Sequence, residues 1–171
     1  FEVYGMRFND FSNVGLELNN DAMSDSKIGS PGKGNIFINN GGVGLNISGA
    51  DNSVVKSNFV GADFDGSEAG NDIGIFIING ATNNIIGDLV AEANVITANN
   101  VGVQVNDATS FGNLIRQNEI FCNISNGIVL AFDGNNNIAS PTISAVSETE
   151  VTGSGVDGQQ IDVYNANDAC G

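Results

Sequence analysis

The sequence predicts an all-β fold: a parallel β-helix with three short strands per coil and about five coils, followed by a short β tail. Three observations support this prediction. The large aliphatic residues comprise 18 Ile and 16 Val but only 6 Leu, an excess of β-branched side chains that favours extended chain. Apolar residues alternate with period two, without a competing helical period. Similar segments also recur along the chain at a nearly constant interval.

The first class of strand begins with a glycine that is followed by an apolar residue. The glycines are Gly15, Gly44, Gly74, Gly102 and Gly127, and they follow one another at intervals of 25 to 30 residues. An interval of this size is typical of one coil of a solenoid. We therefore expect these glycines to stack above one another.

Two further classes of strand recur between those glycines. The second class contains Ile28, Val54–Val55, Ile85–Ile86 and Leu114–Ile115, and the third reads NIFIN from Asn35, NFVGAD from Asn58, NVITAN from Asn94 and NEIFCN from Asn118. A two-sheet sandwich would also contain many short strands, but it would not explain why each class returns at the same phase. The recurrence favours a coil in which each strand pairs with its counterpart one coil later.

Asparagine and glycine are expected at the corners of the coil, because both tolerate left-handed backbone conformations. The chain has 27 Asn, and stacked asparagine side chains can form a hydrogen-bonded ladder. The candidate ladder residues are Asn39, Asn99 and Asn123, with Asp63 as the irregular member. Cys122 aligns with the inward side of its strand and is predicted to be a buried thiol that does not pair with Cys170.

The turns between the second and third strands are predicted to alternate between long and short. The short turns carry Lys56 and Arg116, whereas the long turns insert GSPGKG or GDLVAEA. The largest insertion elsewhere, FDGSEAGND, follows Asp63 and is predicted to be the most protruding loop.

The period is lost near residue 140, which divides the chain into a β-helix over residues 1–140 and a tail over residues 141–171. The tail alternations TISAV and QIDVY predict antiparallel strands, either as the start of a truncated β-sandwich-like module or as a strand pair packed on the end of the helix. Both ends of the chain are expected to be cut from a longer protein. Exposed coil ends would then favour oligomerisation.

Composition excludes several functions. Five Lys and Arg stand against 20 Asp and Glu, a formal charge of -15, so nucleic acid is not an expected partner. No apolar run reaches the roughly 18 residues of a membrane-spanning helix. The chain has no His, which removes imidazole bases and histidine metal sites.

The segment NFVGADFDGSEAGNDIGIFIINGATNNIIGDLVAEANVITANN resembles the right-handed parallel β-helix repeat family, of pectate-lyase-like architecture, in secreted and surface proteins of bacteria. The resemblance covers about residues 10 to 130. It implies a right-handed coil and an extracellular or cell-surface location. In that family the same coils serve lyases, hydrolases, epimerases and non-catalytic stalks, so the motif specifies architecture and not activity.

Three groups of residues are candidates for chemistry. Asp63, Asp65, Glu68 and Asp72 could surround Ca²⁺, although the EF-hand spacing is not met and a solvated turn is the alternative. Lys56 and Arg116 could act as the base and cation of a β-eliminating lyase, and both could equally cover apolar surface and pair with acids such as Glu119. Asp21 with Asp25, and Asp88 with Glu92, are the carboxylate pairs that a glycosidase would need.

We expect a non-catalytic structural or adhesive segment of a secreted or cell-surface bacterial protein, with an extracellular glycan or a surface protein as its partner. No catalytic, cofactor-binding or metal-binding residue is assigned. The alternative is a fragment of a polysaccharide lyase or glycoside hydrolase with the same fold.

Overall fold

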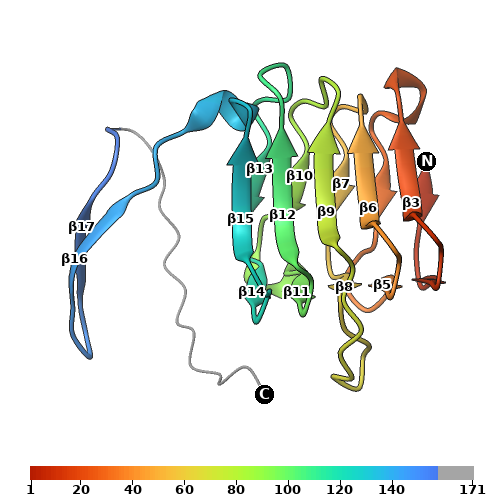
Figure 1. Cartoon of the computed structure of the whole chain (residues 1–171), viewed down its shortest axis with the longest axis horizontal. Helices are drawn as coiled ribbons and strands as arrows, with labels where there is room; N and C mark the ends of the chain where they lie inside the picture. The colour runs from red at the N-terminus through yellow and green to blue at the C-terminus, as the bar shows by residue number, and fades with distance from the viewer. Residues whose placement is uncertain (158–171) are drawn as a thin grey trace.

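The structure, a computed structural model, describes residues 1–157 and confirms the all-β parallel β-helix. Three parallel sheets of five strands each surround one core, and the chain winds about four turns through them. The coil is right-handed, and the strands of one sheet lie side by side along its axis (Figure 1). Right-handed crossovers are the rule for parallel strands of a single sheet.

Each coil contributes one strand to each sheet. Sheet A contains β1 (Glu2–Val3), β4 (Lys27–Ile28), β7 (Val54–Val55), β10 (Ile85–Gly87) and β13 (Leu114–Arg116). Sheet B contains β2 (Arg7–Asn9), β5 (Ile36–Ile38), β8 (Phe59–Val60), β11 (Val95–Thr97) and β14 (Glu119–Phe121). Sheet C contains β3 (Val14–Asn19), β6 (Val43–Ser48), β9 (Ile73–Ile78), β12 (Val101–Asn106) and β15 (Asn126–Ala131). Short 3-10 turns lie at η1 (Asp21–Met23), η2 (Val90–Glu92) and η3 (Gly134–Asn137).

The repeated glycines stack in sheet C, as predicted. A Cβ atom on Gly44 would lie 2.8 Å from the carbonyl oxygen of Gly74, and one on Gly74 would lie 2.6 Å from that of Gly102. The side-chain amide nitrogens of Asn71 and Asn99 would lie 3.0 Å from the same two Cβ positions. Glycine recurs at this position because the next coil and an asparagine amide together fill the space of a side chain.

The core is a column of aliphatic side chains with one aromatic stack at its beginning. Each sheet contributes fully buried residues, for example Ile86 from sheet A, Ile96 from sheet B and Ile75 from sheet C. The rings of Phe8 and Phe37 stack with their centroids 5.0 Å apart. Every coil therefore buries its apolar positions against the coils on either side, as solenoid repeats do.

Asparagine ladders run along two corners of the coil, and a mixed ladder runs along the third. The ladder between sheets A and B contains Asn35, Asn58, Asn94 and Asn118, with Nδ2 to Oδ1 distances of 2.8 to 2.9 Å. The ladder between sheets B and C contains Asn40, Asn71, Asn99 and Asn123, with distances of 2.8 to 3.1 Å. The third ladder begins with Ser26 and Ser53 and continues through Asn84, Asn113 and Asn135.

An asparagine in the middle of a ladder joins three consecutive coils. The Nδ2 atom of Asn94 donates to the carbonyl oxygen of Val55 at 2.8 Å and to Oδ1 of Asn118 at 2.8 Å. Its Oδ1 atom accepts from both the backbone and the side chain of Asn58. These bonds satisfy polar groups that are fully buried at the corners, where an unpaired group would be costly.

Two of the predicted ladder residues are wrong. Asn99 and Asn123 are confirmed, but Asn39 is exposed and its neighbour Asn40 is the ladder member. Asn39 adopts a left-handed backbone with φ of 51°, and this turn places the following residue in the ladder. Asp63 is also excluded, because the insertion that it begins delays the ladder position of that coil to Asn71.

The turns between sheets A and B alternate in length, as predicted. Residues 29–35 and 88–94 form long turns, whereas residues 56–58 and 117–118 form short ones. The insertion between β8 and β9 extends further from the coil than any neighbouring turn in the view of Figure 1. It is closed at its base by an isolated bridge between Ala62 and Glu68.

The described part of the tail is an antiparallel hairpin of β16 (Thr142–Val146) and β17 (Val151–Ser154). Every residue of the two strands is exposed. The predicted strand QIDVY, residues 160–164, lies outside the described residues. The division of the chain at residue 140 stays a prediction.

Candidate functional site

A row of apolar side chains lies on the outer face of sheet B. The residues at one register position are Arg7, Ile36, Phe59, Val95 and Glu119, in the order of the coils. The outer face of a sheet that meets solvent is normally polar. Here only the two ends of the row are charged. The apolar middle of the row is the kind of surface that another group normally covers.

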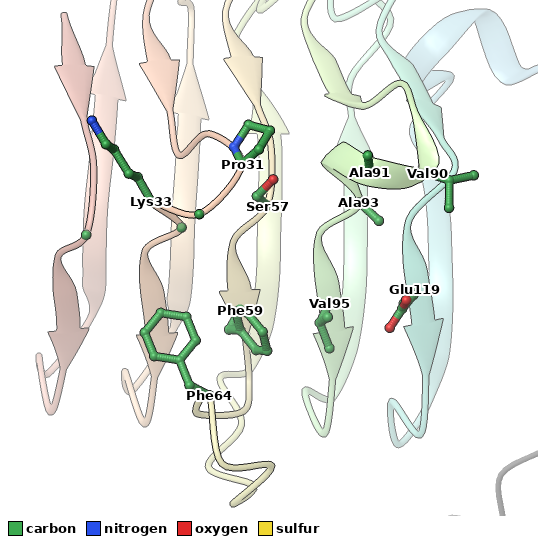
Figure 2. A pocket seen from close by; sticks show the side chains of 13 residues that line it. Pro31, Lys33, Ser57, Phe59, Phe64, Val90, Ala91, Ala93, Val95 and Glu119 are labelled. Carbon is green, nitrogen blue, oxygen red and sulfur yellow. The ribbon is translucent and has the colours of Figure 1, made fainter.

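The long turns form walls beside the apolar row and leave a groove over the third coil (Figure 2). Pro31 and Gly34 come from the long turn of the second coil, and Ala91 and Ala93 come from that of the fourth. The groove has a volume of about 500 Å³, which is within the usual range for ligand sites. Alternating turn lengths therefore create a concave surface on an otherwise convex coil.

The two walls meet at Ser57, which lies on the short turn between them. The backbone N–H of Ser57 donates to the carbonyl oxygen of Glu92 at 2.9 Å. A Cβ atom on Gly34 would lie 1.8 Å from the carbonyl oxygen of Ser57, so only glycine allows the first wall to approach. Within residues 1–157, the Ser57 Oγ atom is buried and has no hydrogen-bond partner. A buried hydroxyl group without a partner is uncommon in folded proteins.

An aromatic pair closes the other end of the groove. Phe64, from the insertion after β8, meets Phe59 edge to face, with ring centroids 4.7 Å apart and an interplanar angle of 77°. Phe64 is 59% exposed, so its ring presents a wide π surface to solvent. The backbone N–H of Phe64 donates to Oδ1 of Asp63 at 2.7 Å, which fixes the start of the insertion.

An ion pair anchors the base of the same insertion to the first coil. The Arg7 guanidinium donates to a carboxylate oxygen of Asp63. The hydrogen bond from Arg7 and then the one from the Phe64 backbone lower the pKa of Asp63 below its ordinary value. Asp63 is therefore an anchor for the loop that carries Phe64.

The candidate calcium ligands do not converge. Besides the Asp63 pairing, Asp65 accepts hydrogen bonds from the hydroxyl and backbone N–H of Ser67, and these lower its pKa. Asp72 accepts from Nδ2 of Asn100 at 3.0 Å. Across residues 1–157 no group of three or more acidic or sulfur ligands is arranged to hold a metal ion. The carboxylates of the insertion instead shape the loop through local bonds.

Of the candidate lyase residues, Lys56 directly follows β7 and Arg116 ends β13, two strands away in sheet A, at the phase that the sequence predicts. Arg116 pairs in register with Gly87 on the intervening strand. The Lys56 ammonium lies 2.6 Å from a carboxylate oxygen of Glu92 and 3.8 Å from one of Asp88. Lys56 therefore pairs with acids of the long turn over residues 88–94 and not with Glu119, the partner suggested by the sequence.

The Lys56 ion pairs involve both members of one candidate glycosidase pair. Asp88 and Glu92 both face the same ammonium group and brace the second wall of the groove. Asp21 and Asp25 are both exposed, next to η1 and away from the groove-lining residues. In neither candidate pair do the two carboxylates face each other across the groove.

Cys122 is not the buried free thiol that the sequence predicts. It is half-buried and disulfide-bonded. It occupies a left-handed corner position with φ of 50°, equivalent to Ala98 one coil earlier. The prediction failed because period-two alternation ends at this corner. Cys170 lies outside the described residues.

The residues that line the groove were not identified from the sequence as a site. They are Gly5, Pro31, Gly32, Lys33, Gly34, Ser57, Phe59, Phe64, Val90, Ala91, Ala93, Val95 and Glu119. Two signals could have located them: the alternation of turn lengths, and the apolar residues at outward positions Phe59 and Val95. Combining these signals requires the coil register, which comes from the fold.

Comparison with protein-family models, curated proteins and solved structures gives no match to this chain. Within residues 1–157, no helix has the length and apolar character needed to cross a membrane. The conclusions about function consequently depend on the geometry of the groove and the coil.

Proposed function

We propose that this chain is a non-catalytic adhesive segment of a secreted or cell-surface bacterial protein, and that the groove on sheet B binds its partner. The observation that carries the proposal is the concave site itself: an apolar floor, two walls made by long turns, and an unpaired hydroxyl at Ser57. Ligand sites commonly combine an apolar lining with a few polar groups of this kind.

The coil suits a structural role because it is rigid along its axis. The ladders link consecutive coils at three corners, and parallel strands pair throughout each sheet. A binding surface on such a scaffold is held in place with little loss of conformational entropy when a partner binds. A glycan and a surface protein are both candidate partners for the groove.

A polysaccharide lyase or hydrolase is the alternative function. A lyase base needs an accessible and poorly solvated amine, whereas the Lys56 side chain is 19% exposed and lies against two carboxylates. This arrangement favours bracing of the groove wall over proton abstraction.

The test compares binding and turnover in the same preparations. Val95→Lys places a charged chain on the floor of the groove, and Gln104→Lys adds the same charge to the outer face of sheet C. We expect binding to bacterial or host surfaces to be lost only with Val95→Lys, with no turnover of uronate or neutral glycans. Turnover that disappears in Lys56→Met would instead establish the enzyme alternative. Equal binding by both lysine variants would show that the groove is not the adhesive site.

A further inference from the structure

The charge of the groove indicates what kind of group it accepts. Glu119 lies at one end of the floor, and its carboxylate is directed toward the groove in Figure 2. In the described part of the chain this carboxylate takes part in no ion pair. The ammonium end of Lys33, at the other rim, is directed away from the groove in the same view. Of the two charged residues among the described residues that line the groove, Glu119 is therefore the one presented to a ligand.

Aromatic surface lies next to that carboxylate. Phe59, Val95 and Glu119 share one register position on neighbouring strands, so about 10 Å separates the Cα atoms of Phe59 and Glu119. Phe64 extends the aromatic surface beyond Phe59. A cation that lies over Val95 would thus be within reach of a carboxylate on one side and of aromatic rings on the other.

We propose that the groove binds an arginine side chain of a partner polypeptide, which rests on the proposed function of the groove as an adhesive site. A guanidinium group is planar, stacks on aromatic rings and pairs with a carboxylate through two parallel hydrogen bonds. The formal charge of -15 on the whole chain attracts such a basic partner over a longer range.

Arginine fits this site better than the two nearest alternatives. A lysine ammonium is more strongly hydrated and has no flat face to place on the rings. A neutral sugar could lie on the aromatic surface, but it carries no positive charge to pair with Glu119, which is exposed. The positive charge of the ligand therefore distinguishes arginine from a sugar.

The test uses a capped peptide, acetyl-Gly-Leu-Arg-Leu-Gly-amide, and its citrulline counterpart, which keeps the shape of arginine and removes the charge. Both are titrated into the whole chain, and affinity is followed by amide chemical shifts in NMR spectra. We expect shifts at Phe59, Phe64, Val95 and Glu119, and an affinity for the citrulline peptide at least about tenfold lower, since charge-assisted hydrogen bonds are lost. Higher ionic strength should reduce this difference.

Two variants complete the design. Glu119→Gln should lose most of the preference for the arginine peptide over the citrulline peptide, whereas Glu17→Gln, a matched change on the outer face of sheet C, should keep the wild-type preference. Equal affinities for the two peptides in the wild type would overturn the proposal. If the neutral sugar cellohexaose shifts the groove residues and the arginine peptide does not, the groove remains an adhesive site but its ligand is a glycan. If neither probe binds and Val95→Lys leaves surface binding intact, the proposed function fails as well.

Discussion

Replacing Gly74 by alanine tests the close stacking of the coils in sheet C. The new Cβ atom would lie 2.6 Å from the carbonyl oxygen of Gly102, 3.0 Å from Nδ2 of Asn99 and 3.0 Å from Cγ1 of Val60. Real Cβ atoms essentially never approach other atoms within 3.0 Å, so β12 must move away. That movement would also strain the ladder bond that Asn99 makes to the next coil.

The expected cost follows from these distances. Overpacking in a filled interior destabilises by about 1–3 kcal/mol, and the lower chain entropy of alanine in the unfolded state offsets about 0.4–1 kcal/mol. A net loss near 1.3 kcal/mol corresponds to a fall in Tm of about 3–5 °C for a chain of this length. Gly74 has no positive φ, so the loss measures crowding and not backbone strain.

Gly127 supplies a matched control at the same register position. It lies on β15, which within residues 1–157 pairs with β12 alone, and among the same residues an added Cβ atom would meet Cγ2 of Ile120, at 3.2 Å. We expect Gly127→Ala to stay within about 1 kcal/mol of the wild type. Urea unfolding followed by circular dichroism measures both variants. Equal stabilities for the two variants, or an unchanged Tm for Gly74→Ala, would refute the stacking.

Three further predictions concern polar contacts. Asn99→Asp places a carboxyl group in a fully buried ladder. Because burial raises the folded pKa of this carboxyl group, the loss of stability should grow as pH rises above about 4. Asn52→Asp, at an exposed position, should unfold like the wild type at each pH. Lys56→Met removes the brace of the second groove wall, and hydrogen exchange of the Ser57 amide should become faster while the core amides stay unchanged. Because Arg7 lowers the pKa of Asp63, the ion pair stabilises the folded state at pH values above the unfolded pKa of about 3.9. This stabilisation is lost as pH falls through the folded pKa of Asp63. NMR titration of Asp63 should show a higher pKa in Arg7→Met.

The architecture was readable from the sequence because a solenoid repeats its requirements in every coil. Glycine returns where the next coil leaves no room for a Cβ atom, and apolar residues return where strands face the core. Alignment of the segments NFVGAD, NVITAN and NEIFCN matches Val60, Ile96 and Ile120, and these residues pair in register in sheet B. Five coils thus supply repeated observations of the same local rule.

Errors arose where a coil departs from that repeat. The NN pair at the corner after β5 contains one left-handed residue and one ladder residue, and composition does not distinguish Asn39 from Asn40. The insertion after β8 shifts the ladder residue of its coil to Asn71, beyond the position that simple alignment indicates. A corner likewise removed Cys122 from the core.

The groove was harder to predict because its residues are distant in sequence. Pro31, Ser57, Ala91 and Glu119 come from four coils, and each is unremarkable in its own segment. For the candidate lyase residues, sequence spacing drew attention to a charged side chain but did not show which residues surround it. Lys56 carries a charge in a suggestive position, but its carboxylate partners come from a turn about one coil later in the chain.

The register of the coils can be measured directly with nitroxide labels on the outer face of sheet C. Glu17, Asn46, Phe76, Gln104 and Val129 occupy one register position on five neighbouring strands. Labels attached through p-acetylphenylalanine at positions 17 and 129 should be about 19 Å apart between Cα atoms, and labels at positions 17 and 104 about 14 Å apart. Dipolar broadening of the continuous-wave electron paramagnetic resonance spectrum should therefore be stronger for the 17 and 104 pair than for the 17 and 129 pair. A longer distance for the 17 and 104 pair than for the 17 and 129 pair would contradict the stacked coil.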